Sequence, residues 1–244
     1  MPPSHPPTTV DAADAVARWQ RLDPDAADRH RELTARLEAG LRFEAADGFE
    51  LTDVVRATVA ARAALLTLEL ADDCLDLMGP VIVHAGAIEV AGPHAVGDGL
   101  MSDDPVALAG EAHHRGPVLL AWDEVTLDVA RPERGRDVVL HELAHQLDMV
   151  DGWVDGTPPV WGDERAAWIE VCTAALDRLR AGDSPLDPYG ASDPGEFFAV
   201  AVEAFFTRPA VVRHHEPDLY AVLSRHLDQD PAARGVGAPY AAPP

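Results

Sequence analysis

The segment 138–152, VVLHELAHQLDMVDG, constrains the fold of this 244-residue chain more than any other. Its apolar residues recur at helical spacing, so we expect a helix over residues 136–150. Two histidines four positions apart lie on one face of a helix, and His141 and His145 can therefore hold the same ion. Glu142 directly follows the first histidine, where its carboxylate can reach a water molecule on that ion. The segment therefore predicts one Zn²⁺ per chain, held on a buried helix.

A catalytic zinc site also needs a third protein ligand and an open position for water. Asp151 follows the second histidine by six residues, as in the pattern HExxHxxGxxD, but that pattern needs glycine where this chain has Asp148. Glu196 and Glu203 lie seven residues apart in PGEFFAVAVEAFF, on one face of another expected helix, as in the gluzincin arrangement. Spacing does not choose between these two glutamates. Asp148 follows the first histidine by seven residues, and we expect it to orient a ligand histidine.

The order of helical and strand-like stretches predicts an α+β protein, dominated by helices, with a small central sheet. Beside the 136–150 helix, we expect helices at 11–20, 24–39, 52–77, 164–180, 195–207 and 217–227, and strands at 80–84, 87–90 and 117–122. Residues 92–116 are rich in Gly, Asp and His and predict a loop with at most one short strand. The expected organisation is a disordered tail (1–10), an N-terminal helical and mixed part of the catalytic unit (11–110), a metallopeptidase core (111–232) and a second disordered tail (233–244).

Composition excludes several classes of function. A net charge of −23, with 42 acidic against 19 basic residues, argues against direct binding of nucleic acid. We find no apolar run of membrane-spanning length and no secretory pattern in MPPSHPPTTV, so we expect a cytoplasmic protein without membrane attachment. Cys74 and Cys172 lack a CxxC partner, which excludes a thiolate zinc site. The metal ligands must then be histidines and carboxylates.

Five pieces of this sequence, in the same order and spacing, resemble the Mlc titration factor A family of zinc peptidases. They are GEAHHRGPVLLAWDEV, VVLHELAHQLDMVDG, GTPPV, DPYGASDPGEFFAVAVEAFF and PDLYAVLSRHLDQDP. The resemblance covers about half the chain, mainly residues 122–231. The catalytic segment is also similar to the protease domain of anthrax lethal factor. These resemblances imply a zincin-like fold, Glu196 as the third zinc ligand, Tyr189 as a catalytic group, and Glu203 as a supporting acid.

The expected activity is hydrolysis of a peptide or protein substrate, with Glu142 as general base on a zinc-activated water and Tyr189 stabilising the oxyanion. The resemblance also implies an alternative, in which the protein binds and sequesters a transcriptional repressor and its peptidase activity is weak or latent. Residues 117–125 predict a strand, for which two roles remain open. It can be an edge strand that borders the cleft and binds an extended peptide, or an ordinary core strand.

Overall fold

The computed structural model describes residues 8–70, 79–86 and 117–235, together with short strands at 88–90, 94–95, 101–102, 106–108 and 110–112. Helices dominate this part of the chain, which also contains a small sheet, and this confirms the predicted balance of helix and strand. One cluster of buried apolar side chains runs from Ala12 to Ala232, so the first helix and the last share a core. Within the described residues, no helix is both long and apolar enough to cross a membrane.

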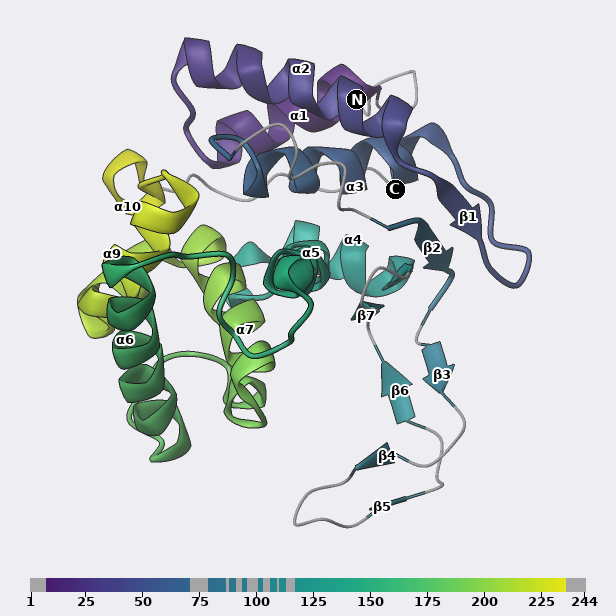
Figure 1. Ribbon diagram of the computed structural model, residues 1–244. Helices are drawn as coiled ribbons and strands as arrows, with labels where there is room; N and C mark the ends of the chain where they lie inside the picture. The colour runs from purple at the N-terminus through teal and green to yellow at the C-terminus, as the bar shows by residue number, and fades with distance from the viewer. Residues whose placement is uncertain are drawn as a thin grey trace.

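Three helices form an N-terminal layer, drawn in purple and blue in Figure 1. They are α1 (Thr9–Trp19), α2 (Pro24–Gly40) and α3 (Asp53–Leu66). Each begins at a side-chain cap, and the hydroxyl of Thr8 caps α1 in a reciprocal pair with Asp11. The predicted tail over residues 1–10 is therefore too long by two residues, because α1 already includes Thr9. Residues 1–7 lie outside the described part of the chain.

The third helix is shorter than the sequence predicts. The apolar pattern suggested a helix to residue 77, but α3 ends at Leu66 and a turn follows as far as residue 70. Leu68 in this turn is buried, so the apolar pattern continues although the helix has stopped. The remainder of the predicted helix, residues 71–78, lies outside the described residues.

The central sheet has the strand order β1-β2-β8-β7. Strands β1 (Phe43–Ala45), β2 (Val81–His84) and β8 (Val118–Ala121) run parallel, and β7 (Gly110–Ala112) pairs antiparallel with β8. The possible edge position of residues 117–125 is therefore wrong, because β8 has a neighbour on each side and the edge strands are β1 and β7. Buried side chains of β8 support the core role instead.

The strand at β8 also ends earlier than expected. Helix α4 (Trp122–Ala130) begins directly after it and buries Val125 and Val129, which are one helical turn apart. No glycine or proline separates the strand from this helix. The boundary therefore lacks the usual sequence signal.

Residues 92–116 contain more strand than predicted. Four of the described strands lie there: β4 (His94–Ala95), β5 (Met101–Ser102), β6 (Val106–Leu108) and β7. β6 pairs with β3 (Ile88–Val90), and β4 pairs with β5. These two antiparallel pairs form an arm that extends away from the helices in Figure 1. The strands are only two or three residues long, too short for an alternating pattern to appear in the sequence.

The C-terminal half is helical and surrounds α5 (Val138–Asp148), which Figure 1 shows nearly end-on in the middle of the molecule. A 3₁₀ turn (Met149–Asp151) extends α5. The remaining helices are α6 (Asp163–Arg180), α7 (Pro194–Thr207), α8 (Pro209–His215), α9 (Pro217–Leu227) and α10 (Pro231–Arg234). The last of these overlaps the predicted C-terminal tail, and residues 236–244 lie outside the described chain.

Candidate metal centre

Helix α5 begins at Asp137, whose side chain accepts a hydrogen bond from the backbone N–H of Leu140 at 3.2 Å. Leu140, Leu143 and Leu147 are buried and fix the helix in the core. That packing leaves the histidines of HELAH on the face that meets α7. Their rings lie edge to face with centroids 4.9 Å apart. Helix packing therefore brings both histidines together on the face of α5 that meets α7.

Helix α7 carries the two glutamates. Asp193 caps it, accepting from the backbone N–H of Glu196 at 3.0 Å, and Pro194 occupies its first turn. Most of its other side chains are apolar and buried, including Phe197 and Phe205, as expected of a helix in the core. The face that carries Glu196 and Glu203 is turned toward α5.

The two glutamates bind opposite edges of the same imidazole. Nε2 of His141 lies 3.1 Å from Oε2 of Glu196, and Nδ1 of His141 donates to Oε1 of Glu203 at 2.7 Å. Nε2 of His145 lies 3.2 Å from Nε2 of His141 and 3.6 Å from Oε2 of Glu196. One oxygen of Glu196 therefore lies close to Nε2 of both histidines. Glu203 instead lies behind the first histidine.

These three atoms have the spacing of metal ligands. A tetrahedral zinc ion with bonds of about 2.0–2.1 Å separates its ligand atoms by about 3.3 Å. The three observed separations of 3.1, 3.2 and 3.6 Å scatter around that value. Among the described residues, His141, His145 and Glu196 form a group of this kind. The donor set, two imidazoles and one carboxylate, is one that zinc accepts.

The electrostatics of the group favour a cation. Burial lowers the pKa of His141, but hydrogen bonds to Glu196 and Glu203 outweigh it and raise the pKa to about 10. Burial raises the pKa of Glu196, but hydrogen bonds from the two histidines outweigh it and lower the pKa to about 2. The same negative charge that favours a proton on the imidazole favours a metal ion between the three side chains.

Glu142 and Tyr189 lie near the three ligand atoms. Glu142 is 3% exposed, and its Oε2 has no hydrogen-bond partner among the described residues. Burial raises the pKa of its carboxyl to about 7, against the opposing charges of His141 and His145. The ring of Tyr189 lies 6.1 Å from that of His141 between centroids, and its side chain is exposed. Partial burial of the side chain, with the charges of Glu196 and Glu142, raises the pKa of Tyr189 to about 12, so the phenol keeps its proton at neutral pH.

The structure places Asp151 outside the group of three. Its carboxylate accepts from the backbone N–H of Trp153 at 3.1 Å and thereby closes a turn after α5. This agrees with the lack of a glycine at position 148. The possibility that Asp151 is the third ligand is not supported by its position.

Asp148 makes a contact that the sequence did not suggest. Its Oδ2 accepts from the backbone N–H of Gly156 at 2.9 Å, which ties the segment after α5 to the helix. Its Oδ1 and Nδ1 of His145 are both buried without a hydrogen-bond partner among the described residues. The expectation that Asp148 orients a ligand histidine therefore stays a prediction.

The segment 152–162 runs beside the start of α7. Gly156 has a φ of +72°, and a Cβ on it would lie 2.3 Å from the backbone oxygen of Pro194, so only glycine fits there. Its own carbonyl accepts from Nε1 of Trp168 at 2.9 Å. Trp153 and Trp161 in the same segment are 72% and 74% exposed. The sequence analysis missed these two tryptophans, although tryptophans in a Gly- and Pro-rich segment are a usable signal of a binding loop.

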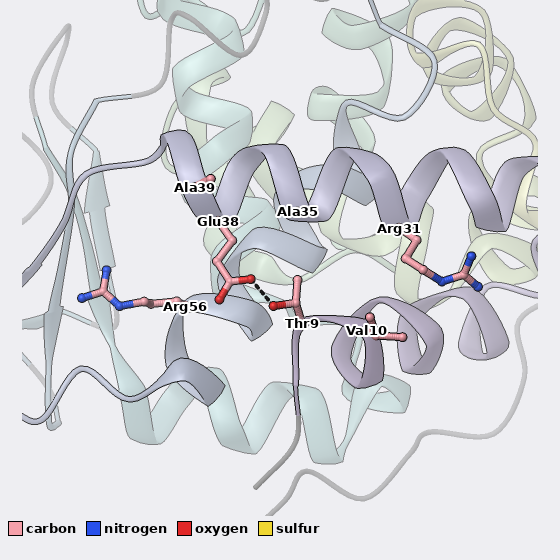
Figure 2. Close-up of a pocket in the computed structure, with 7 residues that line it drawn as sticks. All are labelled: Thr9, Val10, Arg31, Ala35, Glu38, Ala39 and Arg56. Atoms are coloured by element: carbon pink, nitrogen blue, oxygen red, sulfur yellow. Dashed lines mark hydrogen bonds between the residues drawn. The ribbon is translucent and has the colours of Figure 1, made fainter.

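A hollow lies away from these residues, in the N-terminal layer. Figure 2 shows it between α1, α2 and α3, with a volume of about 380 Å³. Its charged groups are already engaged: Glu38 accepts from Thr9, Arg31 pairs with Asp14, and Arg56 lies 5.3 Å from the ring centre of Phe43. None of its seven lining residues is a histidine or a cysteine. The α5–α7 contact is therefore the stronger candidate site.

Comparison with known proteins identifies the family of this chain. The family of the glucose-regulated metallo-peptidase M90 matches residues 3–227. This chain belongs to that family. The predicted relationship to the Mlc titration factor A proteins is also confirmed, and it extends beyond the half of the chain where we recognised it.

Three relatives from different bacteria each match most of this M90 chain. Mlc titration factor A of Serratia proteamaculans is 34% identical over 77% of this chain and 74% of its own length. Mlc titration factor A of Pectobacterium atrosepticum is 30% identical over 87% of this chain and 84% of its own. The uncharacterized protein slr2042 of Synechocystis sp. is 30% identical over 89% of this chain and 82% of its own. The family name implies a metal ion.

Proposed function

We propose that this protein is a zinc-dependent peptidase with its active centre at the α5–α7 contact. The observation that carries the proposal is the convergence of three ligand atoms, on His141, His145 and Glu196, at separations close to those of a tetrahedral ion. Membership of a metallo-peptidase family supports it. In this proposal the three side chains hold one zinc ion, and Glu203 keeps Nε2 of His141 directed at the ion by accepting from Nδ1.

The ion, when bound, would polarise the substrate carbonyl and make a water molecule acidic enough to attack near neutral pH. Glu142 accepts the proton of the attacking water and then donates it to the leaving amine. Its unpaired Oε2 is free to receive that proton.

Tyr189 supplies the remaining group. A phenol with a pKa of about 12 is a hydrogen-bond donor at neutral pH, and it can donate to the oxygen that becomes negative during attack. Tyr189 is exposed, so the site is open to solvent on this side and a peptide can enter there. The antiparallel edge strand β7, which packs near α5, is the strand available to pair with an extended peptide.

Binding of a repressor is the second candidate function. It rests on the name Mlc titration factor A, which two of the relatives carry, and on no feature of the α5–α7 site. The two functions are compatible, because a protein can bind one partner and hydrolyse another. They differ in the part played by the metal ligands: the proposed hydrolysis depends on them, whereas the case for repressor binding does not.

Zinc content and peptide hydrolysis together test the proposal. Wild-type protein, dialysed against zinc-containing buffer and then metal-free buffer, should hold one zinc per chain and cleave members of a peptide library. Glu196→Ala should lose the zinc, whereas Glu203→Gln should retain it when zinc is in excess. Wild-type protein that holds no zinc would overturn the proposal and leave repressor binding as the better candidate.

A further inference from the structure

The N-terminal end of α5 is enclosed by three buried carboxylates. Asp128, Asp137 and Glu203 are 2%, 3% and 5% exposed. Each accepts from a backbone N–H at the start of the helix: Asp128 from Val138 at 3.0 Å, Asp137 from Leu140 at 3.2 Å, and Glu203 from Asp137 at 2.6 Å. The positive end of the helix dipole favours this arrangement. Three buried carboxyl groups so close together would repel one another if all were ionised.

A buried arginine compensates part of that charge. Nε of Arg62, on α3, donates to Oδ2 of Asp137 at 2.7 Å, and the two side chains are 1% and 4% exposed. The guanidinium also lies 4.8 Å from the ring centre of Trp19 on α1. A buried ion pair adds little net stability compared with apolar packing, but it fixes the geometry of its members. The N-terminal layer is thereby connected to the start of α5.

The contacts continue from this arginine to the candidate metal ligand. Arg62 holds the side chain of Asp137, the backbone N–H of Asp137 donates to Oε2 of Glu203, and Oε1 of Glu203 accepts from Nδ1 of His141 at 2.7 Å. Both oxygens of Glu203 are thus used, one to receive from the helix start and one to receive from the imidazole. A shift of Asp137 would move the carboxylate that sets the direction of Nε2.

We propose that Arg62 is a positioning residue for the metal centre, which it influences through Asp137 and Glu203. This inference rests on the proposed function, since it takes His141 as a metal ligand. It assigns to the N-terminal layer, which contributes no ligand to the group of three, a part in holding the ion. Loss of Arg62 would leave Asp137 buried beside two other carboxylates without the cation that packs on it. The contact between Asp137 and Glu203 would then relax, and the imidazole with it.

Metal affinity, measured on folded protein, distinguishes this role from simple core packing. The variants are Arg62→Met, which keeps the apolar stem, and Arg62→Lys, which keeps the charge but not the planar fork. Arg178→Met is the matched control, because Arg178 pairs with the fully buried Glu216 between α6 and α9, outside the contacts that lead to the site. Each protein is stripped of metal, and its zinc Kd is measured by competition with a chelator. The visible spectrum of the Co²⁺-loaded protein and the melting temperature of the apo form are recorded as well.

We expect Arg62→Met to bind zinc about 3- to 10-fold more weakly than wild type and to change the Co²⁺ spectrum. The estimate lies below the 10- to 100-fold loss typical of residues that directly hold a ligand histidine, because Arg62 is two contacts further away. Arg62→Lys should recover part of the affinity. Arg178→Met should lower the melting temperature but leave the zinc Kd and the Co²⁺ spectrum at their wild-type values.

The inference is overturned if Arg62→Met, or Arg62→Lys where the methionine variant does not fold, keeps the wild-type Kd and spectrum. It is also overturned if Arg178→Met weakens zinc binding to the same extent, since the effect would then reflect stability alone. Wild-type protein that fails to bind zinc would instead refute the proposed function. The wild-type measurement therefore separates the two failures.

Discussion

The two ends of the α5–α7 contact both carry carboxylates, but they differ in whether those carboxylates already have hydrogen-bond partners in the protein. At the N-terminal end of α5, both oxygens of Glu203 are occupied, by the backbone N–H of Asp137 and by Nδ1 of His141. One turn further, the atoms of His141, His145 and Glu196 meet at one point, and Oε2 of Glu142 has no partner among the described residues. We call the first region the closed end and the second the open end. A carboxylate with all its partners in the protein fixes geometry, whereas groups with unused bonding capacity can bind an ion and a substrate.

The largest effect should come from the open end. Glu142→Gln keeps the size of the side chain but removes the base, so we expect peptide hydrolysis to fall by about 10³-fold, within the range for general acid–base groups. The zinc content should stay at the wild-type level, because Glu142 is not among the three converging ligands. Near-normal hydrolysis by this variant would show that the unpaired carboxylate is not the base.

Tyr189→Phe tests whether the open end extends to the phenol. We expect kcat to fall by about 10²-fold, because one donor to the developing oxyanion is lost. The zinc Kd should not change, since the proposed role of the hydroxyl lies with the substrate. A loss of zinc instead of turnover would move Tyr189 from the substrate to the metal.

Glu203→Gln tests the closed end. An amide is a weaker acceptor for Nδ1 of His141 than a carboxylate, so we expect zinc affinity to fall about 10- to 100-fold. Glu216→Gln is the control, because Glu216 is equally buried and pairs with Arg178 elsewhere in the protein. If both variants weaken zinc binding equally, the distinction between the two ends fails.

The smallest effect concerns stability at the closed end. Burial, followed by the charge of Asp137, raises the pKa of Asp128 from 3.8 to about 7. The folded state then binds more protons than the unfolded state between these values, so this group makes the fold less stable as pH rises from about 5 to 7. We expect Asp128→Asn to remove about 1 to 2 kcal/mol of that loss. Urea unfolding at both pH values measures it, and an unchanged pH slope would contradict the buried, protonated state.

Much of the helical fold could be predicted from the sequence, because the helices carry local signals. The helix expected at residues 217–227 coincides with α9, which has proline in its first turn and an apolar face. The sheet was less predictable. Residues 117–125 appeared to be one strand because the change to α4 at Trp122 has no glycine or proline, and β7 became the edge through pairing that no local pattern encodes.

The candidate site, like the fold, could be predicted from the sequence only in part. His141, Glu142 and His145 follow from five consecutive residues, and the spacing of Glu196 and Glu203 places both on one face of α7. Spacing could not choose between them, because the choice depends on how α7 is positioned along α5. The contact of Arg62 with Asp137 joins residues 75 positions apart, so only the packing of α3 on α5 reveals it.

The glycine at position 156 has a consequence for redesign. Gly152, with a φ of 98°, and Gly156 bracket a segment of only three residues, Trp153, Val154 and Asp155. Both glycines are fixed by backbone geometry, and Gly156 is further fixed by Asp148 and by the proximity of Pro194. The segment between them lies beside the start of α7, where Val154 approaches Gly195. We expect side chains varied there to alter which peptides the proposed active centre accepts, while His141, His145 and Glu196 keep their positions.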